Sequence, residues 1–120
     1  MATILVVDDR AANLEFLATL LGYVGHEVLQ AADGVDALET LEALNEPVDL
    51  LISDVMMPRM NGSELATNFQ RMQPGTPVLL MSGYMDEMTV RRSFKEPDAV
   101  LAKPFTAEAL GRRLRGVLDG

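Results

Sequence analysis

Short apolar runs alternate with helix-like stripes along the whole chain, and this alternation constrains the fold more than any other feature. Three of the runs have the form of strands that are buried on both faces of a sheet: Thr3–Val7, Val48–Ile52 and Pro77–Met81. Two weaker runs of similar length are Glu27–Ala31 and Asp98–Ala102. Because strands that alternate with helices pair in parallel, the sequence predicts an α/β fold with a five-stranded parallel sheet.

Between these runs, apolar residues recur at intervals of three and four, as they do on one face of a helix. The stripes are Leu14/Leu17/Leu21/Val24, Ala37/Leu38/Leu41/Leu44, Leu65/Phe69/Met72 and Leu110/Leu114/Val117/Leu118. Thr106 stands where it would cap the last helix, with Glu108 in the first turn. The segment Asp86–Phe94 has few large apolar residues, and we expect a short or mobile helix there. Right-handed crossovers then place helices on both faces of the sheet.

Composition excludes several classes of protein. The chain has 120 residues, 48% of them hydrophobic, and this length fits one domain over residues 1–120. No apolar run approaches the roughly 20 residues of a membrane span, and no basic region precedes the first run, so we expect a cytoplasmic protein without membrane contact. The net charge of −8 disfavours direct nucleic-acid binding, and the lack of Cys excludes disulfides and thiolate metal sites.

Polar side chains stand where the predicted strands end. Asp8 and Asp9 follow the first strand, Asp54 ends the third, Ser82 the fourth and Lys103 the fifth. Open parallel sheets bind ligands beyond the carboxyl ends of their strands, so we expect these side chains at one edge. Close carboxylates repel one another unless a cation neutralises them, and Mg²⁺, with Mn²⁺ as an alternative, accepts carboxylate and water ligands. The other interpretation of the acidic pair is a simple helix cap.

Asp54 begins the run DVMMPRMNG, Asp54–Gly62. A carboxylate at a strand end can act as a nucleophile when a metal and a cation neutralise the group that it attacks. Phosphoryl transfer needs mainly in-line positioning and charge stabilisation, which this set of residues offers. Ser82 would donate a hydrogen bond to a phosphoryl oxygen beside the accessible amide of Gly83, although a lone Ser-Gly is more often a turn. Lys103 would add positive charge, with a plain salt bridge as its alternative role.

Together these residues resemble the receiver domains of two-component response regulators. The match rests on Asp8-Asp9, Asp54 with Met57–Gly62, Ser82-Gly83 and Lys103-Pro104-Phe105. The order of the predicted elements agrees with the family over the whole chain. The resemblance implies a doubly wound, flavodoxin-like, three-layer (βα)5 fold with strand order 2-1-3-4-5.

The resemblance also implies a role for each acidic residue. Asp54 would accept a phosphoryl group from a phosphohistidine on a sensor histidine kinase or a histidine phosphotransfer protein. Asp9, Asp54 and the backbone carbonyl of Met56 would bind Mg²⁺ directly, and Asp8 would act through water. The domain would not be an enzyme for other substrates, because it would catalyse only its own phosphorylation and dephosphorylation.

The remaining site residues would detect the phosphoryl group. By the same resemblance, Ser82 and Lys103 would contact phosphoryl oxygens, and the bond from Lys103 to the following proline would be cis. Phosphorylation would pull these two residues inward and shift residues 82–95, so that binding to a partner changes.

The chain departs from the family pattern at Val100, where many receivers carry Tyr or Phe. A β-branched side chain has no comparable swing between two states. The candidates for the switch in this chain are therefore Val100 itself, the hydroxyl residue Ser82, and Tyr84, the aromatic residue nearest to Ser82. We hypothesise that Tyr84 covers or opens the pocket, with a partly exposed loop tyrosine as the alternative. Met56 lies near the expected path of the hydrolytic water and cannot orient it by hydrogen bonding. His26, the only histidine, is expected at the surface and away from the functional edge.

Seven of the ten basic residues fall between Arg91 and Arg115. In the family, the face formed by the fourth helix, fifth strand and fifth helix commonly binds partners or forms homodimers. The candidates to meet an acidic surface on a downstream protein, an attached effector domain or a second copy are Arg91, Arg92, Lys95, Arg112 and Arg113. Ordinary solvation is the alternative for each of them.

Two other functions share part of this residue pattern or this fold. A phosphatase of the haloacid dehalogenase type also uses an aspartyl nucleophile and Mg²⁺, but it places a second aspartate two residues later, where this chain has Met56. A flavin-binding module would need Gly, Ser or Thr in residues Asp8–Asn13 to hold a phosphate, and the two carboxylates there would repel one. A stand-alone regulator and a fragment of a larger protein, such as the receiver of a hybrid kinase, are both consistent with the sequence.

Overall fold

The structure is a computed structural model that describes residues 2–57, 59–82, 100–102 and 105–119. Up to residue 82, strands and helices alternate as the sequence predicts. In chain order they are β1 Thr3–Val7, α1 Ala11–Val24, β2 Glu27–Ala31, α2 Gly34–Ala43, β3 Leu50–Asp54, α3 Gly62–Met72, β4 Val78–Ser82, β5 Val100–Ala102 and α5 Ala107–Asp119.

All five strands form one parallel sheet in the order β2-β1-β3-β4-β5. The parallel sheet and its 2-1-3-4-5 order are therefore confirmed. The chain winds outward from β1 in both directions, so β1 and β3 lie side by side at the point where the winding reverses. Ligands of such sheets bind beyond the strand ends at this point, which is where Asp8 and Asp54 stand.

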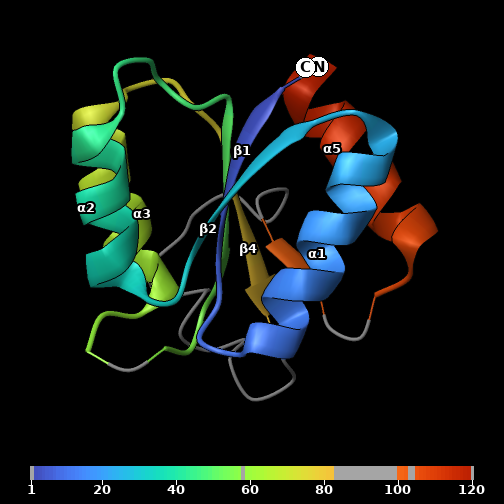
Figure 1. Cartoon of the computed structure of the whole chain (residues 1–120), viewed down its shortest axis with the longest axis horizontal. Helices are drawn as coiled ribbons and strands as arrows, with labels where there is room; N and C mark the ends of the chain where they lie inside the picture. Colours follow the sequence, from blue (N-terminus) through green and yellow to red (C-terminus); the bar gives the residue numbers. More distant parts are fainter. Residues whose placement is uncertain (1, 58, 83–99, 103–104, 120) are drawn as a thin grey trace.

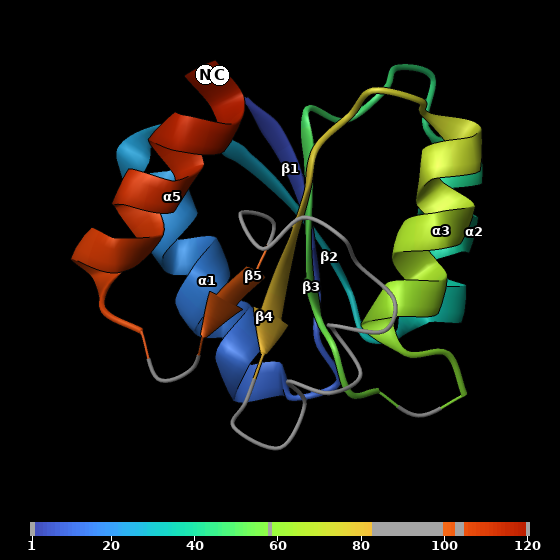
Figure 2. The same ribbon diagram turned by 180° about the vertical axis from the view of Figure 1, so that it is seen from behind.

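Helices cover both faces of the sheet. Figures 1 and 2 show α1 and α5 on one face and α2 and α3 on the other, which makes three layers. Consecutive residues of β1 point to opposite faces, and both faces are buried. Leu5 and Val7 belong to the core beneath α2 and α3, whereas Ile4 and Val6 belong to the core beneath α1 and α5. This double burial explains why the strands are almost continuously apolar.

The strand bounds agree closely with the sequence. β1 and β2 have the predicted bounds, whereas β3 and β4 begin and end slightly later than predicted. The difference at β3 arises because the polar residues Ser53 and Asp54 continue the pairing: Ser53 is the partner of Val7 and Asp54 is the partner of Met81. β5 is described from Val100 onward, and the start predicted at residue 98 lies outside the described residues.

Two residues of the predicted stripes are exposed. Val24 is 64% exposed and Met72 is 42% exposed, although both were expected to pack in the core. Each is the last residue of its helix, at the end of the apolar stripe. The other stripe residues of α1, Leu14, Leu17 and Leu21, are buried as predicted.

The helix ends follow the local sequence. The Ala109 N–H donates to Thr106 Oγ1 at 3.0 Å, which confirms Thr106 as the cap of α5. Asn61 and Glu64 form a reciprocal capping box at the start of α3. The segment Asp86–Phe94 lies outside the described residues. None of the helices in the described part of the chain combines the length and apolar character that a membrane span requires.

Candidate functional site

Three carboxylates meet at the carboxyl edge of the sheet. Asp8 and Asp9 directly follow β1, and Asp54 is the last residue of β3. One carboxylate oxygen from each lies within 4.8 Å of the corresponding oxygens of the other two. Asp8 is fully buried, Asp54 is 5% exposed, and Asp9 is exposed. Placing two buried carboxylates this close together costs free energy unless positive charge neutralises them, so the arrangement favours a cation site.

Asp8 is held in place by the start of α1. The Arg10 N–H donates to Asp8 Oδ1 at 2.9 Å, and Asn13 Nδ2 donates to Asp8 Oδ2 at 3.3 Å. Arg10 is the N-cap residue of α1 and forms no side-chain cap, so neither residue of the acidic pair stands at the N-cap position of this helix. Asn13 was missed by the sequence analysis. Its only signal is an amide in the first turn of a helix that follows an acidic pair.

The loop after Asp54 folds back onto the end of β3. The Val55 N–H donates to the Met81 carbonyl at 3.1 Å, and the Gly62 N–H donates to the Val55 carbonyl at 2.7 Å. Gly62 approaches so closely that a Cβ atom built there would lie 2.3 Å from the Asp54 carbonyl oxygen. The site therefore requires glycine at position 62. Met56 lies in this loop, two residues after Asp54, and is 54% exposed.

Ser82 and Val100 lie on the strands expected to carry them. Ser82 is the last residue of β4, one position after the partner of Asp54 in the β3–β4 register, so its backbone lies at the same edge. Val100 is half-buried, pairs with Leu80, and packs against the core beneath α2 and α3. Its role as a switch candidate stays a prediction.

Several predicted site residues lie outside the described part of the chain: Gly83, Tyr84, Arg91, Arg92, Lys95, Lys103 and Pro104. Their predicted roles stay predictions. Of the predicted partner face, Arg112 and Arg113 are described on α5. Arg112 is exposed and lies 3.7 Å from Glu108 one turn earlier, whereas Arg113 is half-buried.

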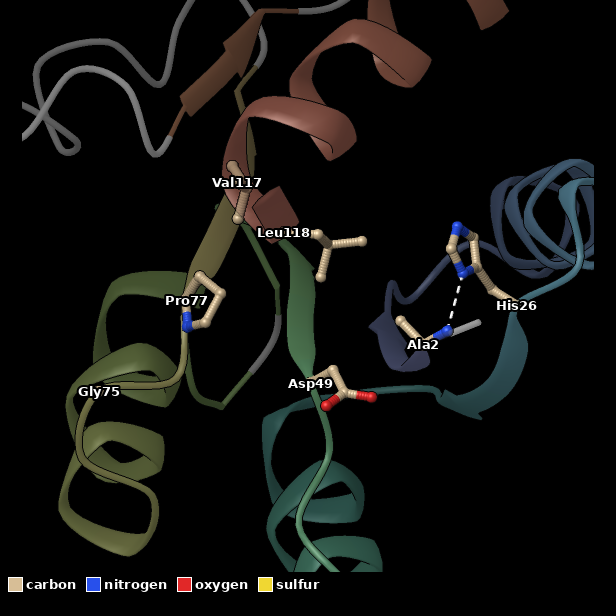
Figure 3. Close-up of a pocket in the computed structure, with 7 residues that line it drawn as sticks. All are labelled: Ala2, His26, Asp49, Gly75, Pro77, Val117 and Leu118. Carbon is tan, nitrogen blue, oxygen red and sulfur yellow. Dashed lines mark hydrogen bonds between the residues drawn. The ribbon is translucent and has the colours of Figure 1, made fainter. Parts of the chain in front are cut away.

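A separate hollow of about 540 Å³ opens at the opposite, amino edge of the sheet. Its lining residues are Ala2, His26, Asp49, Gly75, Pro77, Val117 and Leu118, shown in Figure 3. The Ala2 N–H donates to His26 Nδ1 at 3.1 Å, and the Thr3 N–H donates to Asp49 Oδ2 at 2.8 Å. These two hydrogen bonds connect the start of β1 with the residues that directly precede β2 and β3. His26 lies away from the carboxylates as predicted, but it is half-buried rather than a surface residue.

The comparisons with known proteins agree with this geometry. Residues 4–115 match the family model of the response regulator receiver domain. The chain belongs to this family. Receiver domains are signalling domains of two-component systems, and the match gives no support to the alternative of a haloacid-dehalogenase-type phosphatase.

Receiver domains similar to this chain occur in proteins of different kinds. The sensor kinase CckA of Brucella abortus (strain 2308) is 33% identical over 119 residues, which cover 98% of this chain and 13% of that protein. The response regulator MprA of Mycobacterium sp. (strain KMS) is 38% identical over 117 residues, which cover 96% of this chain and 50% of that protein. The chain thus spans half or less of the length of these curated relatives.

Solved structures share the fold. The chemotaxis protein CheY4 of Vibrio cholerae superposes with a TM-score of 0.82 at 31% identity, covering 98% of this chain and 99% of that one. A response regulator receiver domain protein from Clostridium thermocellum gives a TM-score of 0.86 at 26% identity, covering 99% and 95%. This chain therefore has the flavodoxin-like (βα)5 fold of these receiver domains.

Proposed function

We propose that this receiver domain accepts a phosphoryl group on Asp54 from a phosphohistidine of a sensor histidine kinase or a histidine phosphotransfer protein. The observation that carries the proposal is the set of three carboxylates within 4.8 Å at the carboxyl edge, with Asp54 at the end of the central strand β3. The relatives support a kinase partner, because they include sensor kinases and response regulators.

The donor set fits a hard divalent cation. Carboxylate and carbonyl oxygens are ligands that Mg²⁺ prefers, and Mn²⁺ accepts the same ligands. In this proposal Asp9, Asp54 and the Met56 carbonyl hold the ion, and Asp8 acts through water. Asp8 suits that indirect role because protein donors already hold both of its oxygens. When bound, the ion neutralises charge on the phosphoryl group.

The reaction forms one bond and breaks one. A carboxylate oxygen of Asp54 attacks the phosphorus atom, and the bond between phosphorus and the donor histidine nitrogen breaks. The electron pair of that bond returns to the imidazole, which takes up a proton, and Asp54 becomes an acyl phosphate. Ser82 and Lys103 then contact the phosphoryl oxygens, beside the amide of Gly83. Hydrolysis of the acyl phosphate by water resets the domain.

The output of the domain is altered binding to a partner. In our proposal residues 1–120 act as one cytoplasmic receiver domain that changes only its own phosphorylation state. The output face comprises the fourth helix, β5 and α5, with Arg112 an exposed basic residue in the described part of α5. Its partner is a downstream protein, an attached effector domain or a second copy of the domain, and neither DNA nor a membrane is contacted.

Phosphorylation by a small donor tests the chemistry. Wild type and Asp54→Asn are incubated with acetyl phosphate and Mg²⁺, and the intact masses are compared. We expect a gain of one phosphoryl group in wild type, no gain in Asp54→Asn, and no gain after removal of Mg²⁺ with EDTA. The matched control is Asp49→Asn, because Asp49 is an exposed aspartate at the opposite edge of the sheet. Equal phosphorylation of Asp54→Asn and wild type would refute the assignment.

A further inference from the structure

The loop between β3 and α3 is fastened to the first turn of α2 by an ion pair. Arg59 Nη2 donates to Asp33 Oδ2, and the other oxygen, Asp33 Oδ1, accepts the Asp36 N–H at 2.8 Å. Asp33 is the N-cap residue of α2, so one carboxylate both caps this helix and holds the loop. The Asp36 N–H, and then Arg59, keep the pKa of Asp33 below its usual range, so its negative charge persists at neutral pH.

A second contact joins the next residues of the same two segments. Met60 lies over Gly34, so that a Cβ atom built at Gly34 would lie 2.8 Å from Met60 Sδ and 2.9 Å from Met60 Cβ. Met60 also packs against the core beneath α2 and α3. Figure 1 shows this loop passing beneath the first turn of α2. Two consecutive loop residues therefore contact two consecutive residues at the start of α2.

The loop backbone needs such support. Arg59 has φ 68°, a left-handed conformation that is unfavourable for a residue with a Cβ atom. It stands three residues after Met56, whose carbonyl is the proposed metal ligand. Met56 itself is 54% exposed, so its side chain contributes little packing to hold that carbonyl in place. The contacts of Arg59 and Met60 with the start of α2 restrict the position of this loop.

We propose that Arg59 and Asp33 are positioning residues, which hold the β3–α3 loop so that the Met56 carbonyl is positioned to bind the metal ion. The inference rests on the proposed function, because it concerns the metal site of the phosphorylation reaction. Since Arg59 is 66% exposed, solvent screens the pair. Its loss is expected to weaken Mg²⁺ binding by about two- to fivefold, and by less at high salt.

Neutralising one partner at a time tests the pair. Asp33→Asn keeps a good N-cap but loses the charge, and Arg59→Gln keeps the length of the polar side chain. We expect each variant to raise the Mg²⁺ dissociation constant measured by isothermal titration calorimetry. The double variant should bind Mg²⁺ no more weakly than the single variant with the lower affinity, because the two residues act as a unit. At saturating Mg²⁺, the rate of phosphorylation by acetyl phosphate should return to that of wild type.

The matched control is Glu108→Gln, which neutralises the acidic partner of an exposed ion pair in the first turn of α5. It should leave Mg²⁺ binding unchanged. Wild-type affinity in Asp33→Asn and Arg59→Gln, or additive losses in the double variant, would overturn the positioning role while leaving the proposed function intact. A wild-type protein that neither binds Mg²⁺ nor gains a phosphoryl group would overturn the proposed function itself, and the positioning role with it.

Discussion

Replacement of Gly62 by alanine is the most direct test of the way in which the loop folds back on β3. The added Cβ atom would lie 2.3 Å from the Asp54 carbonyl oxygen and 3.0 Å from Val55 Cα. Both are backbone atoms of the end of a central strand, so no flexible side chain can move aside. The start of α3 or the end of β3 must shift instead, and the 2.7 Å hydrogen bond from the Gly62 N–H to the Val55 carbonyl weakens.

The cost follows from these two effects. Inserting a methyl group into close-packed surroundings typically costs about 1–3 kcal/mol. Weakening one hydrogen bond adds about 0.5–1.5 kcal/mol, and the better helix propensity of alanine returns up to about 1 kcal/mol. We therefore expect Gly62→Ala to lower the free energy of unfolding by about 2–3 kcal/mol, which corresponds to a fall in Tm of roughly 6–15 °C for a domain of this size.

Thermal and urea unfolding, followed by circular dichroism, measure this difference. The control is Gly116→Ala within α5, where an added Cβ atom meets nothing within 4 Å, so alanine should stabilise by up to about 1 kcal/mol. Gly34→Ala should fall between the two, because the Met60 Sδ atom can rotate away, whereas Met60 Cβ, at 2.9 Å, moves only with its own backbone. If Gly62→Ala unfolds like wild type, the close approach to Asp54 does not constrain this position.

Three further predictions concern the site and its supports. Met56→Asn should change the decay rate of the aspartyl phosphate, followed by intact mass, because an amide can orient the hydrolytic water; equal decay rates would contradict this. Asn13→Ala should weaken Mg²⁺ binding by up to about tenfold in calorimetry, because Asn13 Nδ2 no longer holds Asp8; unchanged affinity would show that the Arg10 amide suffices. Asp33 has a lowered pKa, so its charge stabilises the fold above the ordinary carboxyl pKa of about 3.9 and ceases to do so as pH falls further. The difference in urea unfolding between wild type and Asp33→Asn should be about 0.5–1 kcal/mol at pH 7 and shrink towards pH 3, and a difference that does not vary with pH would argue against a role of the charge.

Contacts made by loops and by the first turns of helices account for most of what the sequence analysis missed. Arg59 and Asp33 are separated by 26 positions and meet only because the β3–α3 loop passes the start of α2. Asn13 contacts Asp8 because the turn at Arg10 directs the first turn of α1 back towards the strand end. Neither contact leaves a periodic pattern, since apolar spacing reports one face of one element at a time.

The sequence by itself determined the elements of this domain and the edge where its chemistry lies. Strands buried on both faces must be almost wholly apolar, so the acidic residues at their ends, Asp8 and Asp54, mark the carboxyl edge. Tertiary structure alone decided which groups hold these carboxylates and which helix-end residues, such as Val24 and Met72, stay exposed. The physical reason is that hydrophobic burial is encoded locally along each strand and helix. Contacts between loops, in contrast, depend on how the crossovers bring separate segments together.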